Sequence, residues 1–443
     1  MAESGILLVD KPQGVTSHDV VAAVRGVLHT RHVGHAGTLD PMATGLLVIG
    51  FGDATRLLRY MVGHDKQYVA TIRLGLATDS DDADGRIFRP DATVRKRVAD
   101  IVKTISLDGL QTLVDEFFVG AIEQIPSAFS SVRVNGKHAY ELARNGEKPN
   151  LAPREVTVHK FDILGLRNDD VRIHDADCRL AVDSADYVGE AADVAGGNDI
   201  DDHIDDHHDH GHDPADGHAD GHADDESSVR VSVLDVFVRV SCSSGTYIRA
   251  LARDLGARLG IGGHLVALRR TRVGGFLVGR EESPYESSVQ PANPQIADDA
   301  PLCTMAGTEV RTHVARVRVV PRELTDRKTG KLIVRNRAVM LEDAESLLKS
   351  ALSPAVAAST MMNSIDISAK EAEDLSYGRI ITRHVSDPTA AIYEPRHSSA
   401  PSESATATSS PRLCAILVPY RHDSAKPQTV FSNAFEEWQK KQK

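Results

Sequence analysis

The alternation of apolar and polar positions in the first half of the chain predicts short strands with a few helices between them. Ile6–Asp10 and Leu46–Ile49 are largely apolar runs of strand length, and Tyr68–Leu74 alternates as a half-buried strand does. Ser17 is a suitable N-cap for a helix, because the apolar residues after it recur at helical spacing. Residues 108–120 predict a further helix.

Similar patterns resume in the second half of the chain. Val229–Val233 and Val236–Val240 alternate strictly, which predicts two strands or one long bent strand. The turn at residues 243–246 then opens a helix that Gly260 ends. The buried stripe of this helix consists of Ile248, Leu251, Leu255 and Leu259. Because the strands are many and few helices separate them, the fold class is predicted as α+β rather than a doubly wound sheet.

Composition indicates more than one domain in the 443 residues. Residues 1–280 hold most of the strand and helix patterns. Residues 281–305 are rich in Pro, Ser and Asp and are predicted to be a linker. Residues 306–443 are predicted to form a small β-rich domain, which contains a low-complexity loop at 397–411.

The formal charge of −12 is concentrated in one segment. Residues 183–226 contain sixteen Asp and Glu, seven His and no Lys or Arg, and we expect them to be a disordered insertion. Without this segment, 51 basic residues face 47 acidic ones, a balance that is compatible with a local phosphate-binding patch. The histidines also permit a metal-storage or metallochaperone role, but we favour a solvated inserted loop with incidental metal affinity.

Cysteine usage and the N-terminus indicate a cytoplasmic protein. The four cysteines are far apart in the sequence and form no CxxC pair, which argues against zinc sites and a disulfide framework. No apolar run approaches the ~20 residues of a membrane span. The acidic N-terminus lacks the basic region of a signal peptide.

One carboxylate stands in an unusual setting. The run from Gly34 to Gly45 reads Gly-His-Ala-Gly-Thr-Leu-Asp-Pro-Met-Ala-Thr-Gly and holds a single acid, Asp40. Pro41 disfavours helical backbone angles at Asp40, so we expect the carboxylate on a rigid turn. A structural turn former and a catalytic carboxylate both fit this setting.

Further short motifs follow one another along the chain. They are Lys11-Pro12 with Gly14-Val15-Thr16-Ser17, Gly52-Asp53-Ala54-Thr55-Arg56, Lys66-Gln67-Tyr68, Asp84-Gly85, Ile125-Pro126, Gly136-Lys137 with Tyr140, Gly245-Thr246-Tyr247-Ile248-Arg249, and Leu268-Arg269-Arg270. Together with the Asp40 run, this series resembles the TruB family of pseudouridine synthases over most of residues 5–275. One such motif alone is weak, whereas this many in one order are specific.

The resemblance implies an architecture. Residues 1–280 would form a pseudouridine-synthase catalytic domain built on a mixed, mainly antiparallel sheet, and residues 306–443 a PUA-like RNA-binding domain. Residues 125–150 resemble the insertion that grips RNA in stand-alone members of the family. The acidic segment 183–226 departs from the family pattern.

The resemblance also implies roles for single residues. Asp40 would be the nucleophile, Arg249 its ion-pair partner, and Tyr68 the ring that stacks on the target base. Substrate-binding roles fall on five further residues, namely Lys11, His35, Lys137, Tyr247 and Leu268. Neither a cofactor nor a metal is implied. Without the resemblance, Tyr68 would fit a core position, Arg249 a surface position and His35 a turn.

The function implied is an isomerase that converts uridine 55 in the T loop of tRNA to pseudouridine after flipping the base. The carboxylate could attack C1′, attack the base, or abstract a sugar proton. The T stem-loop of tRNA is the expected partner of a monomer that has no obligate protein partner and no membrane contact. The alternative is a non-catalytic RNA-binding or tRNA-folding protein that uses the same surface.

Overall fold

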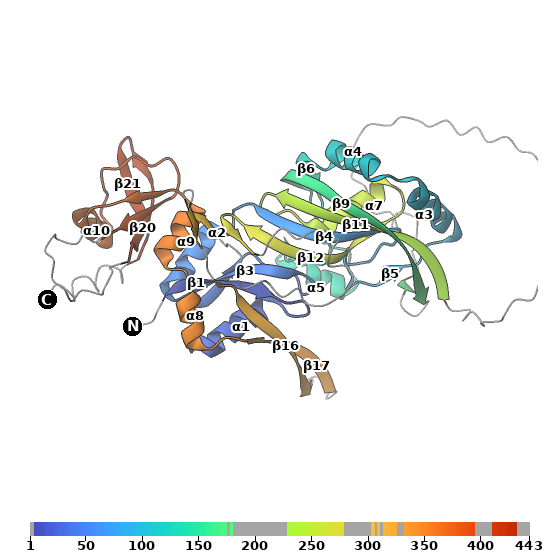
Figure 1. Cartoon of the computed structure of the whole chain (residues 1–443), viewed down its shortest axis with the longest axis horizontal. Coiled ribbons are helices and arrows are strands. Elements are labelled where there is room, and N and C mark those ends of the chain that lie inside the picture. Colours follow the sequence, from blue (N-terminus) through green and yellow to red (C-terminus); the bar gives the residue numbers. More distant parts are fainter. Residues whose placement is uncertain are drawn as a thin grey trace, which may run out of the picture.

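The computed structural model describes residues 4–174, 178–179, 228–278, 303–305, 308–310, 313–325, 332–394 and 410–431. Figure 1 shows a long twisted sheet with helices along it and a small β unit at one end. The acidic segment 183–226, most of the expected linker 281–305 and nearly all of the loop 397–411 lie outside the described residues.

The large sheet has nine strands on its main path. In spatial order they are β17 (Leu332–Met340), β16 (Ala315–Thr325), β1 (Gly5–Lys11), β3 (Thr44–Phe51), β12 (Gly263–Val273), β4 (Lys66–Leu74), β11 (Ser228–Cys242), β9 (Arg154–His174) and β6 (Gly120–Gln124). Short strands β2 (Val33–Ala36), β13 (Phe276–Leu277), β14 (Cys303–Met305) and β15 (Thr308–Val310) extend it. On the main path, β1–β16 and β3–β12 are parallel and the other pairs antiparallel, which confirms the predicted mixed, mainly antiparallel sheet.

Helices cover the sheet and fill its ends. The α-helices are α1 (Ser17–Leu28), α2 (Leu58–Met61), α3 (Ala92–Thr104), α4 (Leu107–Phe117), α5 (Ala139–Arg144), α7 (Ile248–Arg258), α8 (Ala344–Ser350), α9 (Pro354–Met361) and α10 (Ala369–Ser376). Two small ribbons lie apart from the large sheet: β5 (Ile87–Phe88) with β10 (Cys178–Arg179), and β7 (Arg133–Val134) with β8 (Lys137–His138). Among the helices that the structure describes, none has the length and apolar character of a membrane span.

The start of α1 differs from the prediction. Thr16 is the N-cap, and it forms a capping box with Asp19: the Asp19 amide donates to Thr16 Oγ1 (3.1 Å), and the Thr16 amide donates to Asp19 Oδ2 (2.8 Å). Ser17, the predicted cap, is buried instead. Its hydroxyl accepts from the Leu39 amide (2.9 Å) and donates to the Leu39 carbonyl (3.1 Å). The residue that seemed suited to the helix thus holds a distant loop.

The two alternating segments after residue 228 form one strand, β11, with bulges near Phe237 and Cys242. Asp235 lies at the centre of β11 with a fully buried side chain. It accepts from Arg73 of β4 (2.7 Å) and Arg167 of β9 (2.7 Å). Burial raises the pKa of Asp235, but the bonds from both arginines outweigh it and the net pKa is lowered. This ion triad connects three neighbouring strands.

The C-terminal region is divided differently from the sequence prediction. Strand β16 pairs with β1 in parallel, with Val9 opposite Ala315, so β16 and β17 belong to the large sheet. The small sheet consists of β18 (Ser364–Asp366), β19 (Thr389–Tyr393), β20 (Arg412–Arg421) and β21 (Ser424–Val430). The small β unit therefore begins near residue 364 rather than 306. Its likeness to a PUA domain stays a prediction.

Gly45 provides a test of how closely β3 and β12 pack. Its φ is +97°, and a Cβ would collide with the backbone of Arg270 on β12. Gly120 has φ +98° with open space around it, so Gly120→Ala is a matched control for backbone strain alone. We expect Gly45→Ala to lower the free energy of unfolding by about 1–3 kcal/mol more than Gly120→Ala does. Denaturant unfolding of both variants measures this difference, and equal losses would contradict the close packing.

Candidate active site

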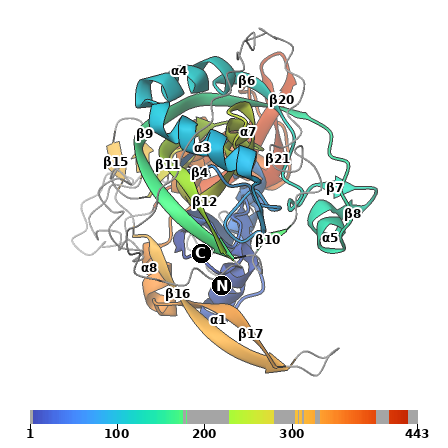
Figure 2. The ribbon, with the colours of Figure 1, turned by 90° about the vertical axis from the view of Figure 1, so that its right-hand side faces the viewer.

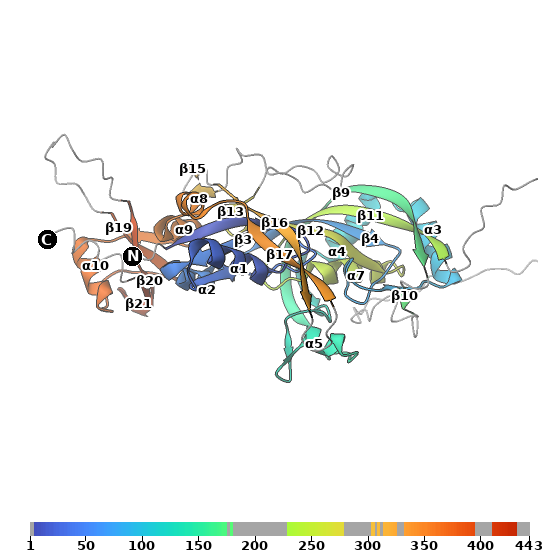
Figure 3. The same cartoon turned by 90° about the horizontal axis from the view of Figure 1, so that it is seen from below.

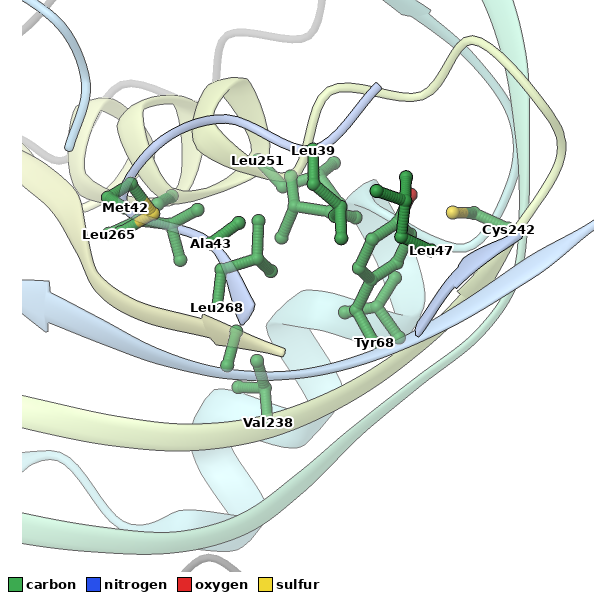
Figure 4. Close-up of a cluster of buried hydrophobic side chains, with 14 of the residues drawn as sticks. Leu39, Met42, Ala43, Leu47, Tyr68, Val238, Cys242, Leu251, Leu265 and Leu268 are labelled. Atoms are coloured by element: carbon green, nitrogen blue, oxygen red, sulfur yellow. The ribbon is translucent and has the colours of Figure 1, made fainter. Parts of the chain in front are cut away.

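Asp40 lies in the loop of residues 37–43, here called the Asp40 loop, which connects β2 to β3. Its neighbours Leu39, Met42 and Ala43 are buried and point into the core between the sheet and α7, as Figure 4 shows. Burying a side chain of the size of Leu or Met contributes about 1.5–3 kcal/mol. These buried side chains therefore fix the loop to the core, while the Asp40 side chain remains 38% exposed.

Lys11 holds the Asp40 loop from the side. Its ammonium is fully buried and donates to the carbonyls of Ala43 (2.6 Å), Pro41 (3.4 Å) and Pro12 (2.9 Å). Burial lowers the pKa of Lys11 to about 8, and the nearby Asp40 opposes this shift. The structure thus differs from the expectation that Lys11 binds substrate, because its donors face backbone carbonyls and not the cavity.

Arg270 of β12 holds the other end of the loop. This arginine is 1% exposed, and it donates to the carbonyls of Leu46 (2.8 Å), Gly37 (3.0 Å) and Thr38 (3.4 Å). The guanidinium carries five N–H donors in a planar fork, which suits a bridge between several carbonyls. Together with Ser17, two buried cations therefore hold a loop that lacks strand partners of its own.

Arg249, in the first turn of α7, connects Asp40 to the rest of the site. Its Nε lies 3.1 Å from Asp40 Oδ2. Its Nη1 donates to Asp82 Oδ2 and to the Ser80 carbonyl, both at 3.1 Å, and its Nη2 to the Phe129 carbonyl at 3.0 Å. Arg249 is 5% exposed, which excludes the surface position that its sequence context also allowed.

The acidic loop of residues 78–85 holds the Arg249 guanidinium in place. Asp82 accepts from Ser80 Oγ (2.5 Å) and from the Asp84 amide (3.1 Å), so its carboxylate is held in place. Arg253, one helical turn after Arg249, pairs with Asp81 (3.2 Å) and donates to the Ile125 carbonyl. Arg249 and Arg253 of α7 thereby fix the acidic loop beside Asp40.

A cavity of about 1080 Å³ opens above the Asp40–Arg249 pair. Its volume is large enough for a nucleotide-sized ligand. Five of the residues predicted for the site line it, namely Asp40, Tyr68, Tyr247, Arg249 and Leu268. The cavity therefore brings together residues from β4, α7, β12 and the Asp40 loop.

Tyr68 and Leu268 form the apolar wall of this cavity. Tyr68 is 9% exposed and Leu268 is 7% exposed, and both also pack in the core, as Figure 4 shows. Burial raises the pKa of the Tyr68 hydroxyl, with the neighbouring Arg270 acting against it. The phenol therefore keeps its proton at neutral pH. Tyr68 therefore packs in the core and also lines the cavity.

His35, Tyr247 and Lys137 have different positions. His35 lies on β2 outside the cavity lining, and its ring stands edge-on to His18 with centroids 5.4 Å apart. Burial, then the nearby His18 and Arg270, lower the pKa of His35. Tyr247 precedes α7, and its backbone exchanges two hydrogen bonds with the Gln124 side chain (2.8 and 3.0 Å). Lys137 is exposed in the β7–β8 ribbon and does not reach the cavity.

The predicted insertion 125–150 contains β7, β8 and α5 and projects from the body (Figure 3). Tyr140 and Arg144 of α5 reach the cavity lining. His138 stacks on Tyr140 at 5.3 Å, and the Arg144 guanidinium lies 5.5 Å from the centre of the same ring. This stack places a cation and an aromatic face at the mouth of the cavity.

Within the described residues, no cluster of His, Cys, Asp and Glu has the arrangement of a metal site.

Comparison with known proteins agrees with this geometry. Residues 25–188 match the TruB family pseudouridylate synthase N-terminal domain, and residues 249–288 match the tRNA pseudouridylate synthase B C-terminal domain. The tRNA pseudouridine synthase B of Bifidobacterium longum subsp. infantis is 40% identical over 451 residues, which cover 97% of this chain and 98% of the relative. The chain belongs to the TruB family. It is therefore an enzyme of the pseudouridine synthase type, as the motifs predicted.

Two further relatives match this TruB family member over about three quarters of its length. The proteins of the same name from Leifsonia xyli subsp. xyli and Thermobifida fusca are each 41% identical. The first match covers 75% of this chain and 84% of the relative, and the second 72% and 87%. The likeness therefore extends well beyond the motif around Asp40.

Sequence reasoning assigned no role to several residues that build the site. Arg270 had a signal: it falls at the same strand parity as the buried Leu268, where an apolar side chain would be usual. The signal for Asp82 and Ser80 was weaker, because the sequence shows only that they belong to the acidic loop of residues 78–85. Ser17 had none, because a serine before a helix is ordinarily its cap.

Replacing Arg249 tests whether it takes part in catalysis or only stabilises the fold. Arg249→Lys keeps the charge but cannot reach Asp40, Asp82 and two carbonyls at once. We expect kcat for pseudouridine formation to fall by about 100-fold, because the carboxylate loses its fixed position. The control is Arg253→Lys, which loosens the same loop without touching Asp40. Single-turnover assays and thermal unfolding of both variants measure the two effects, and an equal loss of kcat in both would leave Arg249 a structural residue only.

Proposed function

We propose that this enzyme converts uridine 55 in the T loop of tRNA to pseudouridine. The observation that carries the proposal is the Asp40–Arg249 pair at 3.1 Å in the wall of a nucleotide-sized cavity. The relatives that match most of the chain are named tRNA pseudouridine synthase B, which supports tRNA as the substrate. The T loop and the position of the uridine follow from the family resemblance of the motifs.

The chemistry needs a carboxylate beside the sugar. The bond from C1′ to N1 breaks, the uracil turns, and a bond from C1′ to C5 forms, while a proton leaves C5 and N1 regains one. All atoms stay within one nucleotide, so the reaction needs neither an oxidant nor a second substrate. Asp40 acts as the nucleophile, and Arg249 orients it by holding Oδ2.

The target base has to leave the RNA stack before it can meet Asp40. Flipping costs a few kcal/mol, and stacking on the Tyr68 ring returns about 1–3 kcal/mol. Leu268 offers an apolar contact to the same base from the neighbouring strand. The protonated phenol of Tyr68 can donate its proton to N1, and the phenolate so formed can then accept the proton that leaves C5. His35 is suited to the space that the flipped base vacates, because it is a neutral ring outside the cavity.

The remaining RNA is held around the cavity. The insertion 125–150 grips the T stem-loop, with Lys137 on its exposed ribbon and Tyr140 and Arg144 at the cavity. RNA is recognised in this way by its shape, by phosphate contacts and by stacking on splayed bases. We infer a monomer that acts in the cytoplasm without an obligate protein partner.

Asp40→Asn distinguishes an enzyme from a protein that only binds RNA. The variant keeps the shape of the side chain but removes the negative charge, so pseudouridine formation should fall to background while tRNA affinity stays within about threefold. Asp84→Asn is the control, since Asp84 also lines the cavity but does not contact Arg249. Chemical mapping of pseudouridine and filter binding give both quantities. Activity near wild type in Asp40→Asn would refute the nucleophile assignment.

Two substitutions of Tyr68 separate proton transfer from stacking. Tyr68→Phe retains the ring and loses the hydroxyl, so we expect kcat to fall by at least about 100-fold with tRNA affinity preserved. Tyr68→Leu should add a loss of affinity, because the stacking contribution of about 1–3 kcal/mol disappears as well. Single-turnover rates and binding constants report these effects. Full activity in Tyr68→Phe would restrict the residue to stacking.

A further inference from the structure

Strands β16 and β17 form a two-stranded ribbon, here called the β16–β17 ribbon, that projects from the body of the protein (Figures 1 and 2). β17 is the edge strand of the large sheet, and the connection between the two strands lies outside the described residues. The ribbon plays no part in the chemistry of the cavity.

The two faces of the ribbon differ sharply. The register places Val319 opposite Ala338 and Val317 opposite Met340, and the half of this face that lies next to the body is buried, with Val317, Ala338 and Met340 in the core. On the other face the exposed arginines gather. They are Arg316, Arg318 and Arg322 of β16, with Arg335 and Arg337 of β17.

Among the residues that the structure describes, four of these five arginines have no acidic partner. Arg316 lies 3.6 Å from Glu342, but Arg318, Arg322, Arg335 and Arg337 form no ion pair within the described residues. Arg322 stands directly opposite Arg335 in the register. Like charges at directly opposed positions destabilise a sheet. The free protein thus carries an unfavourable arrangement that an anionic ligand would relieve.

Protection of the sheet edge does not account for this pattern. Charged side chains do keep edge strands from pairing with other chains, and β17 is such an edge. Charges of either sign serve that purpose, and alternating signs would avoid repulsion. Four cations on one face, two on each strand, exceed what edge protection requires.

The ribbon is joined to the Asp40 loop through the turn after β1. Asn336, between Arg335 and Arg337, donates to the Gly14 carbonyl (3.0 Å), and the Gly14 amide donates to the Pro41 carbonyl (2.8 Å). Pro41 follows Asp40 directly. Figures 2 and 3 show the ribbon and the α5 insertion extending from the same side of the sheet. The base of the ribbon therefore lies next to the Asp40 loop, and Asn336 makes this contact from the face opposite the arginines.

We propose that the arginine face of the β16–β17 ribbon binds the phosphate backbone of an RNA stem adjacent to the nucleotide in the cavity. This inference rests on the proposed function, since it needs an RNA substrate. Guanidinium forks bind phosphate in a bidentate manner. Double-stranded RNA is recognised mostly by its shape and its phosphates, so a row of arginines without base-reading side chains fits it.

The double variant Arg322→Gln with Arg335→Gln tests the proposal in the full-length enzyme. Each lost phosphate contact should reduce the slope of log affinity against log salt by about 1, which gives about 2 in total. Affinity for tRNA at low salt should fall by about tenfold, while kcat at saturating tRNA stays unchanged. The melting temperature should hold or rise, because the repulsion between the two arginines is removed.

The matched control removes two exposed cations elsewhere, by Lys96→Gln with Lys103→Gln on α3. An equal drop in affinity in both double variants would overturn the proposal, because it would show an effect of net charge only. Unchanged affinity and salt slope in the ribbon variant would overturn it too. The proposal would also be overturned if the ribbon variant lost binding to phosphatidylserine vesicles but kept its binding to tRNA. Failure of the proposed function is distinct, since the unaltered enzyme would then form no pseudouridine in tRNA.

Discussion

The site depends on hydrogen bonds from buried side chains to the backbone carbonyls of the Asp40 loop. Lys11 and Arg270 come from two different strands and donate to six carbonyls, four of which belong to this loop. Unpaired buried carbonyls would each cost about 1–3 kcal/mol, so the loop could not stay in this position without them. Because both cations are buried, they are screened little by water and hold the loop firmly. The position of Asp40 follows from this constraint.

The same constraint determines the geometry of the Asp40–Arg249 pair. Leu39 and Met42 anchor the loop in the core against which α7 also packs. Arg249 lies in the first turn of α7, and Asp82 and two carbonyls fix its guanidinium. Two groups from distant segments thus rest on one apolar layer, which holds them 3.1 Å apart. Preorganisation of this kind is what a polar site in a closed cavity requires.

The sequence predicted those parts of the structure whose signals are local. Alternation in Tyr68–Leu74 identified β4, because burial on one face of a strand repeats every second residue. The pairing of β16 with β1 gave no such signal, since it joins residues about 300 positions apart. Lys11 shows a different limit: a lysine is ordinarily exposed, and only the carbonyls around it make its burial favourable. Family motifs predicted the partners of Asp40. The residues that hold these partners in place belong to no such motif and became evident only from the structure.

Net charge describes this protein poorly, because its cations belong to three physical classes. Lys11 and Arg270 are buried against carbonyls, and they support the fold. Arg249 and Arg253 are matched by carboxylates of the acidic loop, so they offer little to a further anion. Arg318, Arg322, Arg335 and Arg337 of the β16–β17 ribbon are exposed and form no ion pair within the part of the chain that the structure describes, so they can attract phosphate. A chain with a formal charge of −12 can therefore bind a polyanion, because attraction depends on where unmatched cations lie rather than on their sum.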